Sequence, residues 1–444
     1  MSGNINRKEQ IENQMLDLIA EYYDLVHKKT GFEPGESLVR YAGRVYDEKE
    51  IQCAMKSIMD FGLTYGPESK AFEGELAKYL GRQYVVLVNS GSSANLLAAT
   101  TLLAEDFREK LSPGDEVITP ALTFPTTLAP IVQNRLMPVF VDTHVGTYLM
   151  DIEAIERAVS EKTRAVFLPH TLGNVADMDV VLALCEKHNI ILIEDTCDAL
   201  GSEYKGRKAG SFGLMSTFSF YPAHHITLGE GGAVATDSKR LHRILVSLRD
   251  WGRDCYCTHN SPITGECGKR FEQTWGELPK GYDHKYIYSH IGYNLKALDA
   301  QAAIGLEQLK KLPIFTKKRK AAFRRLYQGL SPFEKYLFLP LATEHADPSW
   351  FCFLISIKPN RYFNRKDLVD FLQKHKIDSR MLFAGNILKQ PAFKNIPHRV
   401  YGSLENTDFI MNNTFFVGVY PGLDDEMLDY MIFVFELFFQ SRVG

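Results

Sequence analysis

Short β-rich runs alternate with helical stretches through the middle of the chain, and this alternation restricts the folds open to it. The runs are Tyr84–Val88, Glu116–Thr119, Pro138–Asp142, Ala165–Leu168, Ile190–Glu194, Thr217–Phe220 and Ala233–Thr236. Strands that alternate with helices form βαβ units, whose mostly parallel sheet is covered by helices on both faces. Several runs end in polar or small residues, where ligands of such sheets gather. The pattern predicts an α/β fold.

The rest of the chain divides around this core. Residues 1–40 carry apolar positions at helical spacing and predict an N-terminal helical segment. We expect a large domain over residues 41–312, with a helical pattern at Leu298–Leu312 and an end to the strand–helix alternation near Pro313. It includes an irregular cysteine-rich segment, residues 254–288, which needs something to hold it. Residues 313–444 mix helices and strands and predict a smaller α+β domain.

Composition excludes several classes of protein. A hydrophobic share of 45% and a charged share of 24% are ordinary for a globular chain. The net charge of −3 gives no basic field for nucleic acid. No apolar run approaches the roughly 20 residues that span a bilayer. The first residues are polar and lack the apolar stretch of a signal peptide, so we expect a cytoplasmic location and no membrane contact.

Two motifs follow strands of the predicted sheet. Asn89–Asn95 follows the first strand and opens a helix, so its backbone amides can cradle a phosphate. A plain helix cap explains the same residues. Glu194–Ala199 ends an apolar strand with acids, one of which could keep a heterocyclic nitrogen protonated. A helix cap again remains an alternative.

The segment Ser216–Gly232 is more specific, because it joins a strand, an aromatic corner, a functional side chain and a glycine-rich turn. It resembles the cofactor-lysine region of the sugar aminotransferase family, a branch of the type I pyridoxal-phosphate enzymes. That family has Ser-Phe, three residues, Lys and then Gly-Glu-Gly-Gly, and the lysine position falls on His224. Further matches are Gly62–Pro67, Thr119–Phe124, His170–Asn174 and Gly292–Leu295, so the resemblance covers almost the whole chain.

The resemblance implies roles for individual residues. The family's phosphate-binding serines fall on Ser92, Ser93 and Ser219. By the same analogy, Phe124 stacks on the pyridine ring and Asp195 pairs with its nitrogen. Asn294 would reach the phosphate bound by the neighbouring subunit, which implies a homodimer.

The histidine at the lysine position changes the expected chemistry. Lysine forms a Schiff base with the cofactor and shuttles protons, whereas imidazole cannot form that bond but can act as a base near neutral pH. The cofactor should therefore be held non-covalently as the amine, pyridoxamine 5′-phosphate. The alternative is an inactive enzyme that has lost its lysine, but the intact motif around His224 opposes it. We expect the adjacent His225 to pack away from the site.

Four of the seven cysteines are grouped. Between Cys197 and Cys255 lie 57 residues, one residue separates Cys255 from Cys257, and nine lie between Cys257 and Cys267. Four thiolates can hold a 2Fe–2S cluster or a structural zinc ion. The paired CxxC knuckles usual in zinc sites are absent, which favours the cluster while leaving zinc as an alternative. We expect the other three cysteines to be small buried hydrophobes.

The residues around these cysteines, Asp250–Cys257 and Cys267–Phe271, resemble the CDP-6-deoxy-L-threo-D-glycero-4-hexulose 3-dehydratase family. That family makes precursors of 3,6-dideoxyhexoses for surface polysaccharide. Tyr221–Thr227, Gly281–Tyr286 and Leu382–Asn386 match it too. The gap before Cys267 is slightly longer than the family pattern, which puts the loop geometry in doubt but not the ligand count. A TDP-sugar relative has the same cluster and histidine, so the nucleotide stays open.

The resemblance implies a reaction. The cofactor amine condenses with the C4 ketone of a nucleotide sugar, His224 removes the C4′ proton of the cofactor, and the C3 hydroxyl leaves as water. The cluster then passes single electrons from an NAD(P)H-dependent flavin/iron–sulfur reductase. Asp195 strengthens the ring as an electron sink, and Tyr221, Asp198 and Phe351 are expected near the ring or the sugar. An ordinary sugar aminotransferase, a cluster-free dehydratase and a non-catalytic zinc protein remain as rivals.

Overall fold

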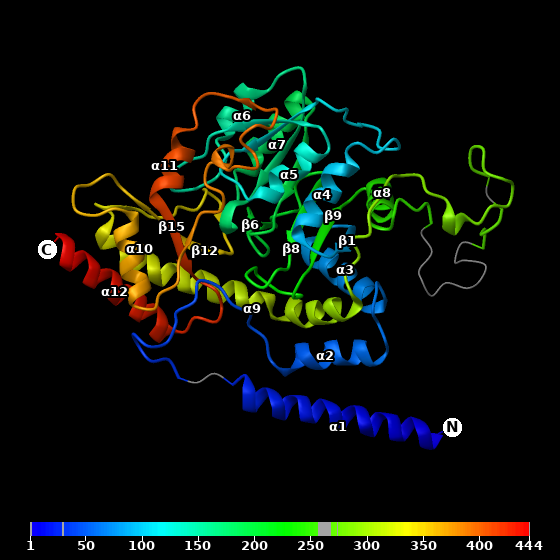
Figure 1. Cartoon of the computed structure of the whole chain (residues 1–444), viewed down its shortest axis with the longest axis horizontal. Coiled ribbons are helices and arrows are strands. Elements are labelled where there is room, and N and C mark those ends of the chain that lie inside the picture. The colour runs from blue at the N-terminus through cyan, green and yellow to red at the C-terminus, as the bar shows by residue number, and fades with distance from the viewer. Residues whose placement is uncertain (1, 29–30, 256–267, 273, 444) are drawn as a thin grey trace.

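The computed structural model describes residues 2–28, 31–255, 268–272 and 274–443, and side chains from residue 7 onward. These ranges form a large α/β part and a smaller α+β part, which the long helix α9 (Asp299–Leu330) joins (Figure 1).

The large sheet has the strand order β1-β9-β8-β5-β4-β2-β3-β14. Its strands are β1 (Tyr84–Val88), β2 (Glu116–Pro120), β3 (Met137–Val141), β4 (Thr163–Pro169), β5 (Ile191–Asp195), β8 (Met215–Ser219), β9 (Gly232–Thr236) and β14 (Arg399–Val400). β9 is antiparallel to both of its neighbours, and the other pairs are parallel. The predicted α/β fold and its seven runs are therefore confirmed, with ends that shift by at most a few residues.

Helices cover both faces of this sheet. They are α3 (Pro67–Leu80), α4 (Gly91–Thr101), α5 (Pro125–Gln133), α6 (Ile152–Ala158), α7 (Met178–His188), α8 (Lys239–Arg249) and the first half of α9. Strand side chains alternate between faces. In β1, Val86 and Val88 pack with α4 and α8, whereas Val85 and Leu87 pack with α3 and α9. α6 and α7 cover the same sheet farther along.

The smaller part is built on an antiparallel sheet with the order β10-β12-β15-β13. Its strands are β10 (Leu337–Phe338), β12 (Cys352–Ile357), β13 (Arg380–Met381) and β15 (Thr414–Gly418). Its helices are α10 (Arg365–Lys374), α11 (Glu405–Asn413) and α12 (Asp425–Val443). A third small sheet joins β6 (Glu203–Tyr204), β7 (Arg207–Lys208) and β11 (Ala346–Asp347). The described residues also form four 3₁₀ turns: η1 (Thr171–Gly173), η2 (His284–Tyr286), η3 (Ser331–Phe333) and η4 (Ile387–Lys389).

The helix α9 is longer than the helical pattern expected at Leu298–Leu312. It continues through Pro313 to Leu330. A proline inside a helix removes one backbone hydrogen bond and costs about 3 kcal/mol in isolation. Packing offsets this, because Leu312 belongs to the core of the large part and Leu326 to that of the small part. The expected division at residues 312/313 thus falls inside one helix and stays a prediction.

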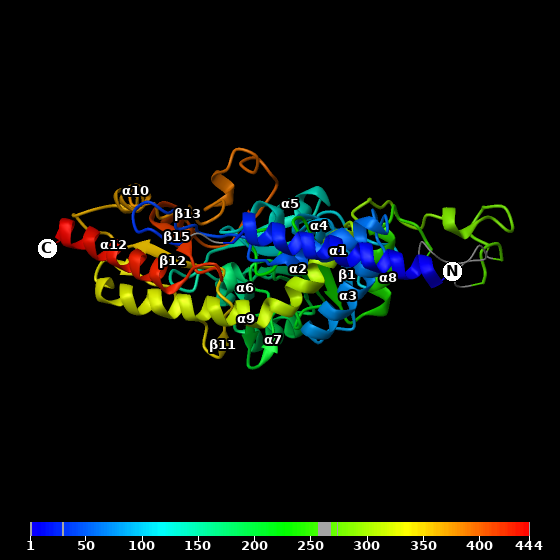
Figure 2. The same ribbon diagram turned by 90° about the horizontal axis from the view of Figure 1, so that it is seen from below.

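Two segments extend from this body. The N-terminal helix α1 (Ser2–Val26) lies against α2 (Glu48–Met59) along one side of the molecule (Figures 1 and 2). The described residues 268–272 and 274–288, between α8 and α9, extend away from the body (Figures 1 and 2), and the irregular stretch expected at 254–288 stays a prediction. Within the described ranges, no helix combines the length and apolar character that a membrane crossing requires.

Candidate functional site

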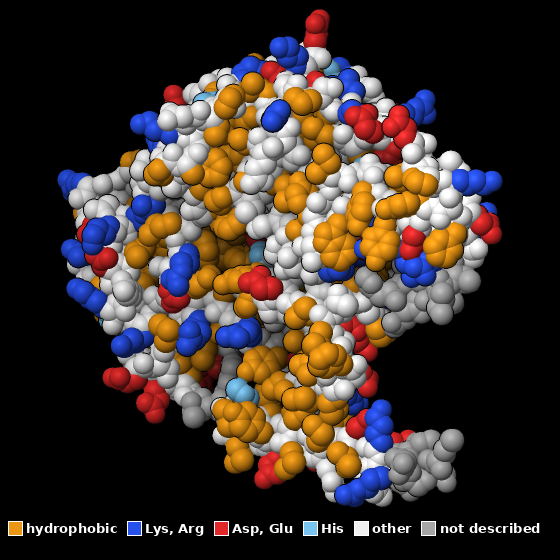
Figure 3. Space-filling view, turned by 45° about the vertical axis from the view of Figure 1, so that its right-hand side comes forward, with side chains coloured by type: hydrophobic (Ala, Val, Ile, Leu, Met, Phe, Trp, Pro, Cys, Tyr) orange, Lys and Arg blue, Asp and Glu red, His pale blue; other side chains and the backbone are white. Residues whose placement is uncertain are grey.

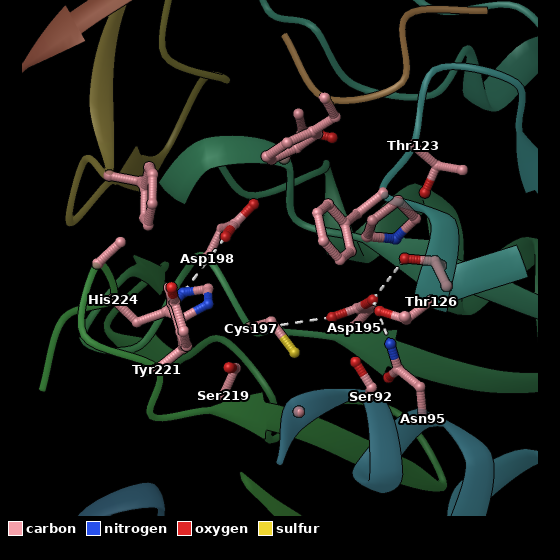
Figure 4. Close-up of a pocket in the computed structure, with 18 of the residues that line it drawn as sticks. Ser92, Asn95, Thr123, Thr126, Asp195, Cys197, Asp198, Ser219, Tyr221 and His224 are labelled. Atoms are coloured by element: carbon pink, nitrogen blue, oxygen red, sulfur yellow. Dashed lines mark hydrogen bonds and ion pairs between the residues drawn. The ribbon is translucent and has the colours of Figure 1, made fainter. Parts of the chain in front are cut away.

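A cavity of about 400 Å³ opens where β5 and β8 end and where α4 and α5 begin. The large part supplies most of its wall, and the small part closes it with Phe351, Arg380, Met381, Phe383 and Phe416. Figure 4 shows Ser92, Asp195, Ser219 and His224 converging on this space from different elements. The cavity therefore lies at the ends of the strands, where the sequence pattern predicts that ligands gather.

The start of α4 forms one end of the cavity. Ser90 caps the helix, because its Oγ accepts a hydrogen bond from the amide of Ser93 at 3.1 Å. Ser92 and Ser219 line the cavity, whereas the Ser93 hydroxyl lies 3.0 Å from Ser90 Oγ and does not line it. Gly91 packs directly on Ser219, where a side chain at position 91 would collide. The absence of that side chain therefore lets Ser92 and Ser219, the two serines of the expected phosphate cradle, lie close together. A helix N-terminus flanked by hydroxyls suits a phosphate.

Asp195 is held rigidly at the end of β5. Its Oδ2 accepts hydrogen bonds from Asn95 Nδ2 at 2.9 Å and Thr127 Oγ1 at 2.7 Å. Its Oδ1 accepts one from the amide of Cys197 at 3.2 Å. Asn95 in turn accepts from Thr217 Oγ1 at 2.5 Å. Such a network fixes the direction of a carboxylate that can pair with a protonated ring nitrogen.

The neighbouring acid has a different function. Glu194 is fully buried and accepts hydrogen bonds from the amides of Gly210 and Gly213, with His170 Nε2 2.9 Å from its Oε2. These contacts tie the loop before β8 to β5. Of the two adjacent acids, Asp195 therefore serves the cavity and Glu194 the fold.

Phe124 is the N-cap residue of α5 and is half exposed. It lines the cavity, and its ring meets that of Phe383 edge to face at 5.7 Å between centroids. An aromatic face in this position suits the stacking expected of Phe124. No role of Phe383 could be predicted from the sequence, because its contact with Phe124 joins the two parts of the chain.

His224 lies in the cavity wall beside Asp198. Its Nδ1 is 3.5 Å from Asp198 Oδ1 and has no hydrogen-bond partner among the described residues. Burial and the nearby Arg319 guanidinium lower the pKa of His224 to about 4, while burial and Asp195 raise the pKa of Asp198 to about 7. The contact therefore joins a neutral imidazole to a carboxyl group and is not a formed ion pair. A neutral imidazole is the form that accepts a proton.

The second histidine points elsewhere. His225 is 2% exposed, and its Nε2 lies 2.6 Å from the carbonyl oxygen of Ser349. It does not line the cavity. Arg319 connects the loop that carries both histidines to the small part, because its guanidinium donates to the carbonyls of His224 and Phe351 at 3.1 and 3.0 Å. The different surroundings of the two histidines make them a natural pair of test and control.

The remaining expected residues divide between the cavity and other surfaces. Tyr221 and Phe351 line the cavity, and the Phe351 ring lies 5.4 Å from that of His224. Asn294 is exposed on the segment before α9 and does not line the cavity of its own chain. Its role across a subunit interface stays a prediction.

The cysteine set is only partly described. Cys197 lines the cavity, and its sulfur points inward on the side of Ser92 and Ser219 (Figure 4). Cys255 follows α8 in the chain and is partly buried. Cys257 and Cys267 lie outside the described residues. Within the described ranges, no group of three or more His, Cys, Asp or Glu residues is arranged to hold a metal ion.

The cavity fits pyridoxamine or pyridoxal phosphate by its own features. It offers a helix N-terminus with two hydroxyls for the phosphate, an oriented carboxylate for the ring nitrogen and an aromatic ring for stacking. Thr123 Oγ1 and His224 Nδ1 are buried there without hydrogen-bond partners in the described part of the chain. A polar ligand would satisfy such atoms. None of the described residues that line the cavity is a lysine.

Comparisons with known proteins agree with this geometry. The chain is 50% identical over 440 residues to the lipopolysaccharide biosynthesis protein RfbH of Salmonella typhimurium, covering 99% of both chains. It is 47% identical over 422 residues to the dTDP-4-dehydro-2,6-dideoxy-D-glucose 3-dehydratase of Saccharopolyspora spinosa, covering 95% of this chain and 90% of the relative.

Among solved structures, the chain resembles the GDP-4-keto-6-deoxy-D-mannose-3-dehydratase of E. coli with bound hydrated PLP. The TM-score is 0.81 at 31% identity, over 89% of this chain and 98% of that one. Residues 45–435 match the model of one protein family. The chain therefore belongs to the DegT/DnrJ/EryC1/StrS aminotransferase family.

Proposed function

We propose that this protein is a cytoplasmic nucleotide-sugar 3-dehydratase that uses pyridoxamine 5′-phosphate, and that its substrate is CDP-4-keto-6-deoxyglucose. The observation that carries the reaction type is His224, which lines the cofactor cavity where aminotransferases keep a lysine. Dehydratases of dTDP- and GDP-linked 4-keto sugars among the relatives support the same reaction. The choice of CDP rests on the sequence around Cys255.

The chain's own groups would divide the work. Ser92, Ser219 and the amides of α4 would hold the cofactor phosphate, and Asp195 would keep the ring nitrogen protonated. When bound, the cofactor supplies a primary amine and an electron-withdrawing ring. Neutral His224 is placed to take a proton from the cofactor's C4′ carbon, which opens the way for the C3 hydroxyl to leave as water.

Asp198 assists this base by its position. Its carboxyl group lies 3.5 Å from His224 Nδ1, and with a pKa raised to about 7 it is partly ionised near neutral pH. The ionised carboxylate can accept a hydrogen bond from Nδ1–H, which leaves Nε2 of the neutral imidazole without a proton and able to accept one on the substrate side. Tyr221 and Phe351 would enclose the sugar and exclude water.

The proposal includes a 2Fe–2S cluster on Cys197, Cys255, Cys257 and Cys267. It is supported by the spacing of the cysteines and by the sequence motifs around them. The cluster would deliver electrons one at a time from an NAD(P)H-dependent flavin/iron–sulfur reductase, so that the C3 position ends as a methylene group. A structural zinc ion on the same thiolates is the competing proposal.

The proposal also includes a homodimer with shared sites. Large apolar side chains are exposed on α1, after α2 and before α9, among them Leu25 at 78%, Phe61 at 79% and Ile291 at 97%. Figure 3 shows hydrophobic side chains gathered over α1 and the adjoining face. Exposed apolar groups of this extent support a subunit interface.

Exchange of the C4′ proton tests the proposal. Wild-type protein loaded with pyridoxamine phosphate and given the 4-keto sugar in deuterated water should exchange one C4′ hydrogen stereospecifically. His224→Asn should lose about 10²–10⁴-fold of that exchange, because a positioned base is removed. His225→Asn is the matched control and should retain it. If His225→Asn lost the exchange while His224→Asn kept it, the assignment of the base would be wrong.

A further inference from the structure

The cavity carries little positive charge for a site that would take a nucleoside diphosphate. Among the described residues that line it, Arg380 is the one lysine or arginine, whereas Asp195, Asp198 and Glu230 bring carboxyl groups. A diphosphate diester carries a negative charge on each phosphate, so it needs a cationic partner at the entrance. We propose that Arg380 binds the diphosphate of the nucleotide sugar, an inference that rests on the proposed function.

The position of Arg380 supports this role. It begins β13, where it pairs with Phe416 of β15 in the small part of the chain. The cofactor phosphate cradle at Ser92 and Ser219 belongs to the large part. A sugar between these two walls would have its ketone near the cofactor and its diphosphate near β13.

The guanidinium of Arg380 is already oriented. It lies over the Tyr41 ring at 4.4 Å from the centroid, and Tyr41 also lines the cavity. Nη1 donates to the carbonyl of Ser379 at 2.8 Å and to the carboxylate of Asp378. Nε and Nη2 make no hydrogen bond to other described residues, so one edge of the fork stays available for phosphate oxygens. A stacked guanidinium loses less freedom when it binds an anion.

Exposure limits the expected effect. The Arg380 side chain is 51% exposed, so water screens its charge. A charged hydrogen-bonded contact of this kind corresponds to about a 10-fold to 100-fold change in affinity. Nearly all of that change should fall on binding of the nucleotide sugar, because Arg380 is not part of the expected cofactor contacts.

Titration of pyridoxamine-phosphate-loaded protein with CDP-glucose, which lacks the ketone and does not react, tests the proposal. Arg380→Gln should raise the Kd about 10-fold to 100-fold, and Arg380→Lys should fall between it and wild type. Affinity for cytidine and for pyridoxamine phosphate should not change. Arg361→Gln is the matched control, because Arg361 stacks on Tyr362 at 5.1 Å but does not line the cavity.

Each other outcome has a defined meaning. If wild type binds CDP-glucose and Arg380→Gln binds it equally well, Arg380 is not the diphosphate ligand, while the proposed function stands. Equal losses in Arg380→Gln and Arg361→Gln, or a parallel loss of cofactor affinity, would also overturn the assignment. If wild type binds no CDP-, dTDP- or GDP-linked sugar, the proposed function itself fails and this inference fails with it.

Discussion

Gly91→Ala is expected to damage the cofactor cradle without touching a chemically active group. A Cβ at Gly91 would lie 2.4 Å from Ser219 Cβ and 3.2 Å from Ser219 Cα. Carbon atoms normally approach to about 3.5–4.0 Å, so the start of α4 and the end of β8 must separate by roughly 1 Å. Overpacking of this kind typically costs about 1–3 kcal/mol.

The same displacement should weaken cofactor binding. Ser92 and Ser219 stand on the two elements that would move apart, so their hydroxyls could no longer reach one phosphate together. A misplacement of about 1 Å can cost about 10²-fold, and we expect the Kd for pyridoxamine phosphate to rise about 10-fold to 100-fold. Absorbance titration measures the affinity, and thermal unfolding of the apoprotein measures the strain.

Two further variants separate the causes. Gly74→Ala in α3 is the matched control, because a Cβ there meets nothing within 4 Å and should stabilise the helix by about 0.5–1 kcal/mol. Adding Ser219→Gly to Gly91→Ala removes the opposing Cβ, so stability should return while the cofactor stays weakly bound. Wild-type affinity in Gly91→Ala would refute the reasoning about this cradle.

Three other results are expected. Borohydride reduction of protein loaded with pyridoxal phosphate should leave no phosphopyridoxyl group in the tryptic peptide that contains His224, and a reduced lysine adduct in the active site would contradict non-covalent binding. Cys255→Ser should remove most of the visible absorbance and the reduced-state EPR signal of anaerobically matured protein, whereas an unchanged spectrum, or zinc in place of iron, would exclude the cluster proposal. Mixed dimers of Asn294→Ala and His224→Asn should regain part of the activity that each lacks alone, because one shared site is then intact; no recovery in verified mixed dimers would place Asn294 outside the partner's site.

Sequence reasoning located the strands well because they are buried on both faces. β4 and β5 read as continuous apolar runs, and their ends carry the polar residues that line the cavity. The helical pattern over Leu298–Leu312 covers only the first part of α9, which continues to Leu330 because its two halves pack in two cores. The local pattern cannot report that Leu326 packs in the core of the small part.

The site shows a similar division. His224 was singled out because it replaces the lysine of a recognisable motif, and Asp195 because it ends a strand and matches the family; both line the cavity. The part that Asn95 and Thr127 play in orienting Asp195 was not predicted, because their hydrogen bonds join segments about 70 to 100 residues apart in sequence. Arg380 carries no motif at all and is noticed only when the charges around the cavity are compared.

The mass of the sugar product tests the central claim most directly. Protein carrying its cofactor and cluster would be incubated with CDP-4-keto-6-deoxyglucose, a flavin/iron–sulfur reductase, NADH and glutamate, and the nucleotide sugar would be analysed by mass spectrometry. The account predicts a 3-deoxy-4-keto product that is lighter than the substrate by one oxygen atom and contains no new nitrogen. An amino sugar that keeps its C3 oxygen would contradict the account, because it would show that the chain transfers the amine and leaves the hydroxyl in place.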